Sequence, residues 1–147
     1  MLEALFEVGN DEFALALMIN SSERGWLHML KKYDATVTHE AWDIKYKNNE
    51  DWTHAWGTAP ANIIPRFLLG IQPIAPGWSR WRLLPSKALT FSADAVIPTP
   101  HGSICVNYDR LKHIINVSVP KGTICEYRTK LQSLKLGAGR HVLDWDL

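Results

Sequence analysis

Between residues 36 and 57 the sequence gathers carboxylates, histidines and tryptophans, which are the side chains that proteins use to hold sugars. Indole faces stack on the apolar C–H faces of a pyranose, while carboxylate and imidazole groups hydrogen-bond to its hydroxyls. A carboxylate held among aromatic rings also serves as a general acid or base. The pattern therefore favours a carbohydrate site. The alternative is that the tryptophans pack at a seam between helices and a sheet while the charges face solvent.

The segment that carries these residues, 34–53, has neither helical nor strand periodicity, and long irregular segments inside compact domains are usually functional. Helices are predicted on both sides of it. A short helix over residues 2–6 ends at Gly9, and a second begins after Asn10. Residues 13–19 include no polar side chain, so this helix is expected to be buried on all sides. A capping box of Asn20 and Glu23 is expected to start the third helix, with inward side chains at Trp26, Leu27, Leu30 and Tyr33.

The pattern changes near residue 72. A fourth helix is predicted from about His54 to Leu69, interrupted by Pro60 and Pro65, and β-strands follow it. Residues 114–119 alternate in polarity as in a half-buried antiparallel strand. The fold class is therefore predicted as α+β, a helical segment followed by a small antiparallel β-sandwich with strands over residues 78–84, 89–97, 103–108, 113–119, 123–128 and 140–145.

Composition excludes several classes of protein. Sixteen basic and fifteen acidic residues give a net charge of +1, which argues against nucleic-acid partners and against a membrane surface. No apolar stretch approaches the roughly 18 residues of a transmembrane helix. Cys105 and Cys125 form neither a disulfide framework nor a zinc cluster, and are expected to be free thiols that fill space in strands, with a disulfide between them as the open alternative. The histidines outside the 36–57 window are isolated, so no metal and no cofactor are predicted; these are His28, His101, His113 and His141.

Three segments resemble the end of the catalytic domain of bacterial α-L-rhamnosidases of glycoside hydrolase family 78: residues 38–43, 51–57 and 59–66. The strand-rich half is similar to the C-terminal domain of that family in residues 97–99, 102–104 and 119–123. The resemblance implies that residues 1–72 are the last helices of an (α/α)6 barrel and that residues 73–147 are a β-sandwich domain. It also implies an inverting glycosidase that removes terminal α-L-rhamnose.

The resemblance assigns roles to four residues. Glu40 matches the general base of the family, Trp42 and His54 match positions that line the sugar pocket, and Trp52 is a weaker match to such a position. The residue before the base is commonly apolar in the family, so His39 receives no role. The general acid of the family lies upstream, and nothing before Asp34 resembles it. We therefore expect the chain alone to be inactive, with a rhamnoside as substrate and the remainder of the barrel, in the same or another chain, as partner.

Two other interpretations remain open from the sequence. The chain is alternatively a non-catalytic carbohydrate-binding or interaction module whose aromatic residues hold a glycan or a partner. The apolar helix face also allows pairing with a second chain that supplies the missing helices. The first alternative predicts that removing the tryptophans abolishes binding while Glu40→Gln changes nothing. Neither the preferred rhamnoside nor the cellular compartment is indicated by the sequence.

Overall fold

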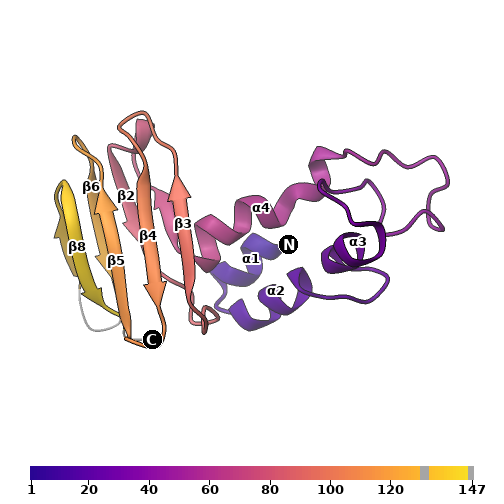
Figure 1. The fold of residues 1–147 in the computed structure, drawn as a ribbon, viewed down its shortest axis with the longest axis horizontal. Coiled ribbons are helices and arrows are strands. Elements are labelled where there is room, and N and C mark those ends of the chain that lie inside the picture. Colours follow the sequence, from indigo (N-terminus) through magenta and orange to yellow (C-terminus); the bar gives the residue numbers. More distant parts are fainter. Residues whose placement is uncertain (130–132, 146–147) are drawn as a thin grey trace. The chain divides into compact units, whose positions relative to one another are not determined.

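The computed structural model describes residues 1–129 and 133–145 (Figure 1). The chain divides into two compact units, Met1–Ile64 and Pro65–Leu147. The first is helical and the second consists of β-strands, so the predicted α+β class is confirmed. The domain boundary after residue 72 stays a prediction. No helix among the described residues is long and apolar enough to span a membrane.

The first unit contains short helices and one long irregular segment. Its α-helices are α1 (Leu2–Glu7), α2 (Asp11–Met18), α3 (Trp26–Tyr33) and α4 (Ala59–Ile63), with the 3-10 turn η1 (Ala55–Thr58) before α4. The π-helical turn η2 (Ile64–Leu68) follows α4 directly and runs across the boundary into the second unit. The predicted fourth helix is thus present but broken into η1, α4 and η2. Pro60 lies within the first turn of α4, where its missing N–H costs nothing.

Two predictions about helix α3 are wrong. The N-cap of α3 is Gly25, because the Asn20 side chain accepts a hydrogen bond from the Ser22 N–H instead and Glu23 pairs with Lys45. A Cβ on Gly25 would lie 2.1 Å from the carbonyl oxygen of Asn20, so the chain turns tightly there. Within α3, Met29 is buried whereas Leu30 is half exposed, contrary to the predicted inward face.

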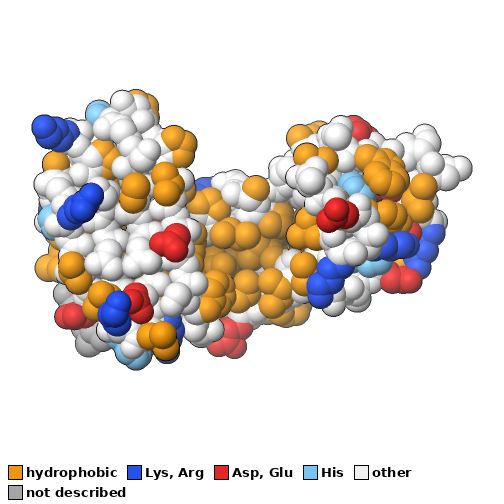
Figure 2. All heavy atoms as spheres, in the orientation of Figure 1, with side chains coloured by type: hydrophobic (Ala, Val, Ile, Leu, Met, Phe, Trp, Pro, Cys, Tyr) orange, Lys and Arg blue, Asp and Glu red, His pale blue; other side chains and the backbone are white. Residues whose placement is uncertain are grey.

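Helix α2 is not buried on all sides, contrary to the prediction from its apolar sequence. Ala14 and Met18 are buried, but Phe13 is 51% exposed and Ile19 is 58% exposed. Figure 2 shows hydrophobic side chains gathered on the surface over α1, α2 and α4. Within this unit the helices cover only one side of α2 and leave its other side exposed.

The second unit is a β-sandwich. Its described strands form two four-stranded sheets, with the orders β1-β2-β6-β7 and β3-β4-β5-β8. One pair, β2 with β6, is parallel and every other pair is antiparallel, so the predicted antiparallel sandwich holds except there. The short 3-10 turn η3 (Pro76–Trp78) precedes β2. The strands are β1 (Ile71–Pro73), β2 (Arg80–Leu83), β3 (Ala93–Ile97), β4 (Ile104–Asp109), β5 (Ile114–Val119), β6 (Ile124–Arg128), β7 (Ser133–Leu136) and β8 (Gly139–Asp144).

Alternating residues build the sandwich core. Along β4 and β5 every second side chain is buried, as the polarity pattern predicts for β5. Trp81 of β2 is fully buried, and its Nε1–H donates to the Thr123 hydroxyl at 3.3 Å. The Tyr127 hydroxyl donates to the carbonyl of Asp144 at 2.6 Å, which links the two sheets. These polar groups of the core are thus paired to backbone or hydroxyl oxygens.

The two cysteines are free and differ in environment. Cys125 of β6 is buried, and burial raises the pKa of its thiol to about 12. Cys105 of β4 is exposed, so the prediction that it fills space in the interior is wrong. The two side chains lie in different sheets.

A glycine at the start of the sandwich has no tolerable replacement. Gly70 has φ of +73°, and a Cβ there would lie 1.9 Å from the Leu84 carbonyl oxygen. Gly77 has φ of +64° but no atom within 4 Å of its Cβ position. We expect Gly77→Ala to destabilise the sandwich by about 1–2 kcal/mol, the cost of the left-handed backbone. Gly70→Ala should destabilise the sandwich more than Gly77→Ala, because the Leu84 backbone must also move to admit the new Cβ. Urea unfolding of the two variants measures the difference, and equal midpoints would contradict it.

Candidate active site

The segment between α3 and η1 carries the residues assigned to the sugar site. Two backbone hydrogen bonds close its base: the Glu40 N–H donates to the Asp51 carbonyl at 2.8 Å, and the His54 N–H donates to the Thr38 carbonyl at 2.8 Å. The Thr38 hydroxyl also donates to the His54 carbonyl at 3.0 Å. These bonds lay residues 38–40 alongside residues 51–54, so side chains far apart in sequence share one location.

The Glu40 carboxylate is held by two donors. Lys47 forms an ion pair with one oxygen, and the Asp51 N–H donates to the other at 3.1 Å. These contacts lower the pKa of Glu40 below its ordinary value, the Lys47 hydrogen bond having the largest effect. The side chain is 28% exposed. An ionised carboxylate has about four acceptor positions, so two remain for a water molecule or a hydroxyl.

Trp52 and His54 lie on the stretch of backbone that pairs with Glu40. The Trp52 ring packs on His39, with ring centroids 4.8 Å apart, and is 46% exposed. The electrostatic interaction with His54 makes a smaller contribution to the lowered pKa of Glu40. The His54 ring meets Trp56 with 6.0 Å between centroids. Three of the four predicted site residues, Glu40, Trp52 and His54, therefore share this paired backbone.

Trp42 is oriented differently. Its ring meets Trp26 of α3 edge to face, with centroids 4.8 Å apart. Trp26 in turn donates its Nε1–H to the carbonyl of Gly57 at 2.7 Å. The observed contact of Trp42 is thus with α3, and its role toward a sugar stays a prediction.

His39, to which the sequence assigns no role, is a buried support. Its side chain contacts both Trp52 and Tyr33, whose ring centroid is 5.5 Å from the His39 ring. The His39 residue is 3% exposed, and its Nδ1 has no hydrogen-bond partner among the residues that the structure describes. Tyr33 also meets Trp52, with centroids 5.4 Å apart. A cluster of three rings therefore fixes the position of the Trp52 indole.

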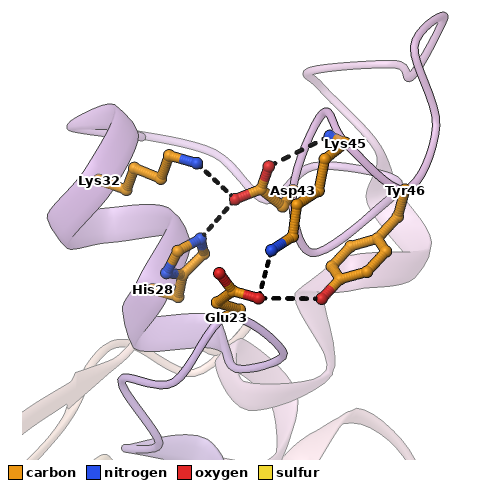
Figure 3. Close-up of polar contacts among 6 residues, drawn as sticks. All are labelled: Glu23, His28, Lys32, Asp43, Lys45 and Tyr46. Carbon is orange, nitrogen blue, oxygen red and sulfur yellow. Dashed lines mark hydrogen bonds and ion pairs between the residues drawn. The ribbon is translucent and has the colours of Figure 1, made fainter.

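A second carboxylate, Asp43, is buried only three residues after Glu40. Figure 3 shows its polar contacts. One oxygen accepts hydrogen bonds from His28 Nε2 at 2.8 Å and from Lys32 Nζ at 2.6 Å. The other oxygen accepts from the Lys45 N–H at 3.1 Å. We call Asp43, His28 and Lys32 the Asp43 cluster. The hydrogen bonds from Lys32 and His28 hold the pKa of Asp43 well below its usual range, and the bond to Asp43 raises the pKa of Lys32 to about 12.

Sequence reasoning missed this cluster because it treated His28 as isolated. The available signal was the spacing of His28 and Lys32, four residues apart and therefore on one face of a helix. Within residues 1–129 and 133–145, no three histidine, cysteine or acidic residues lie close enough to hold a metal ion.

Comparison with known proteins yields two family models that follow one another along the chain. Residues 1–68 match the bacterial alpha-L-rhamnosidase 6 hairpin glycosidase domain, and residues 70–134 match the bacterial alpha-L-rhamnosidase C-terminal domain. No curated protein matches the chain.

Solved structures with the same fold include three α-L-rhamnosidases. The native enzyme from Aspergillus terreus is 18% identical with a TM-score of 0.82, and the enzyme from Dictyoglumus thermophilum is 16% identical with a TM-score of 0.82. The Streptomyces avermitilis enzyme, complexed with L-rhamnose, is 19% identical with a TM-score of 0.79. Each alignment covers 96% of this chain but only 18%, 19% and 16% of the respective structure. With both of its parts matched in this order, the chain belongs to the bacterial α-L-rhamnosidase family, one part being similar to its six-hairpin glycosidase domain and the other to its C-terminal domain.

Proposed function

We propose that this chain supplies the general base, Glu40, of an inverting α-L-rhamnosidase whose general acid lies outside these 147 residues. Trp42, Trp52 and His54 bind the terminal rhamnose of the substrate. The chain by itself has no hydrolase activity, because protonation of the leaving oxygen is missing. General acid catalysis contributes about 10²–10⁴ in rate.

The observation that carries this proposal is the arrangement of the Glu40 carboxylate. It is ionised at neutral pH, fixed by Lys47 and the Asp51 N–H, and still partly open to solvent. A base in an inverting glycosidase needs each of these properties, because it must accept a proton from a water that it also orients. The exposed indole of Trp52 offers the flat apolar surface on which a pyranose stacks.

In the proposed reaction, Glu40 removes a proton from water as the water oxygen bonds to the anomeric carbon. The bond from that carbon to the leaving oxygen breaks, and the external acid donates its proton to the leaving oxygen. The acid and base of inverting enzymes lie about 6.5–9.5 Å apart to admit the water. Attack from the opposite face converts the α-anomer of the substrate into the β-anomer of free rhamnose.

A chromogenic aryl α-L-rhamnoside tests the proposal in two arms. The purified chain is expected to release no aryl alcohol above the blank without enzyme. The same chain joined to, or co-expressed with, the upstream segment that completes the barrel is expected to release it, with β-L-rhamnose as the first product by proton NMR. Turnover by the chain alone would refute the claim that the general acid lies outside these 147 residues. Formation of α-L-rhamnose as the first product would refute inversion.

The exposure of two tryptophans favours a second candidate, a carbohydrate-binding module. Trp52 is 46% exposed and Trp56 is 92% exposed. In that case the chain alone would bind L-rhamnose, Trp52→Ala would abolish the binding, and Glu40→Gln would change neither binding nor the activity of the completed enzyme. Isothermal titration with L-rhamnose distinguishes the two candidates.

A further inference from the structure

We propose that Asp43 is a positioning residue whose buried carboxylate, bonded to His28 and Lys32 of α3, holds the Glu40-bearing segment in place. The inference deepens the proposed function and, as regards catalysis, rests on it. It assigns a role to a carboxylate that neither the sequence pattern nor the family match singled out. The support comes from the burial of Asp43, from the elements that its partners belong to and from the irregular structure of the segment.

Asp43 and Glu40 are three residues apart but face different surroundings. The Asp43 side chain is 2% exposed, whereas that of Glu40 is 28% exposed. Moving a carboxylate out of water is costly unless it is paired and hydrogen-bonded. Asp43 meets this requirement with two side-chain donors from α3 and one backbone N–H, so its burial depends on the cluster.

The partners of Asp43 come from one face of one helix. His28 and Lys32 are four residues apart on α3, and both contact the same Asp43 oxygen. Because an ionised carboxylate only accepts hydrogen bonds, Nε2 of His28 must carry a proton and donate it. Trp42, the residue before Asp43, also packs on α3 through Trp26. Two consecutive side chains thus tie the segment to the same helix.

Outside the Asp43 cluster the segment is held by scattered contacts, such as the Lys47–Glu40 ion pair and the ring contacts of Trp52, rather than by regular secondary structure. Residues 34–54 form no helix or strand, so no regular ladder of backbone hydrogen bonds fixes them. The Glu40 N–H and His54 N–H bonds close the base of the segment, and the buried Glu50 carboxylate accepts from the Ala41 N–H at 3.2 Å. Where no regular ladder holds a region, losing a buried hydrogen bond is expected to shift its local opening equilibrium.

A nearby ion pair provides the matched control. Glu23 and Lys45 also form an ion pair that ends on this segment, but their side chains are 61% and 46% exposed (Figure 3). Exposed pairs contribute little because water screens their charges. If burial is what makes Asp43 a positioning residue, Glu23→Gln should leave the segment unchanged although it also removes a carboxylate charge next to residue 45.

Backbone amide exchange in the whole 147-residue chain tests the positioning role without any substrate. In Asp43→Asn we expect the amides of Glu40 and His54 to exchange about tenfold faster or more, while those of Ile115 and Val117 in β5 keep their rates. Glu23→Gln should exchange as the unchanged chain does. Unaltered protection of Glu40 and His54 in Asp43→Asn would overturn the proposal.

Asp43→Asn could also unfold α3, which would appear as lost protection of the Leu30 amide. In that case a second variant provides the test. Lys32→Gln removes one partner whose side chain is 47% exposed, so α3 is expected to survive. Faster exchange at Glu40 with Leu30 still protected supports the proposal, and unchanged exchange at Glu40 contradicts it.

The catalytic consequence has its own measurement in the enzyme completed by the rest of the barrel. Displacing Glu40 by about 1 Å should lower kcat by about 10²-fold. Because the base is still present in Asp43→Asn, added azide should not restore turnover, whereas it should do so in Glu40→Ala. Rescue of Asp43→Asn by azide would overturn the positioning role. Failure of the general-base proposal would appear instead as full activity in Glu40→Gln, and would leave the exchange result untouched.

Discussion

Replacing Glu40 by Gln is expected to lower the kcat of the completed α-L-rhamnosidase by about 10²–10⁴-fold, the range that a general base contributes. The amide is close in shape to the carboxylate and leaves the segment in place, but it does not accept a proton from water. The KM for an aryl rhamnoside should change little, because Trp52 and His54 remain. Steady-state kinetics with the chromogenic substrate provide the measurement, and a kcat within a factor of three of the original would refute the assignment.

Azide distinguishes a missing base from a misfolded site. In Glu40→Ala the shorter side chain leaves room for azide, an anion that attacks the anomeric carbon without needing a base. We expect azide to restore turnover and to yield the β-configured rhamnosyl azide, because attack still comes from the face opposite the leaving group. If Glu40→Ala gives only free rhamnose in the presence of azide, at the rate seen without azide, the role of Glu40 is contradicted.

Lys47→Met is the control that keeps the base and removes its partner. Glu40 is active as a base only when ionised, so kcat/KM should fall on the acid side as pH drops through the pKa of Glu40. Lys47 and the Asp51 N–H lower that pKa, so the acid limb should lie below the ordinary glutamate value of about 4.3. In Lys47→Met the limb should move up toward that value while activity at pH 7 persists. An unmoved limb would show that another group controls it.

Trp81→Ala is expected to destabilise the sandwich by about 3–5 kcal/mol, the usual cost of removing a large aromatic side chain from a core. Trp81 is fully buried, and no small shift of β2 refills the volume, since its neighbouring strands β1 and β6 are hydrogen-bonded to it. The Thr123 hydroxyl loses the Trp81 donor but still donates to the Pro120 carbonyl at 3.0 Å, so the cavity accounts for most of the effect.

The measurement must follow the sandwich alone, because a chain of two compact units need not unfold in one step. Amide signals of β5 during urea unfolding report on that unit. Leu111→Ala, at a residue in the same unit that is 92% exposed, is the control and should stay within about 0.5 kcal/mol of the original chain. A Trp81→Ala midpoint equal to that of Leu111→Ala would contradict the placement of Trp81 in the core.

Local pattern determined those features of this protein that depend on neighbouring residues. The alternation of polarity from Ile114 to Val119 predicts which side chains β5 buries, because a strand turns every second residue to the same face. The predicted strands match β4, β5, β6 and β8 to within one residue at each end, whereas β1 and β7 escape prediction because they are only three and four residues long. The residues around Glu40 likewise indicate the family from sequence alone, because they follow one another within a short stretch of the chain.

Only the tertiary structure decided which distant groups meet. The burial of Asp43 depends on His28 and Lys32, 15 and 11 residues earlier, and nothing in the residues next to Asp43 distinguishes it from a solvent-exposed acid. The parallel pairing of β2 with β6 joins strands that are far apart along the chain, with β3, β4 and β5 between them. The exposed face of α2 also depends on tertiary structure. An apolar sequence indicates that a helix is suited to burial, but the neighbouring elements decide which of its faces are covered.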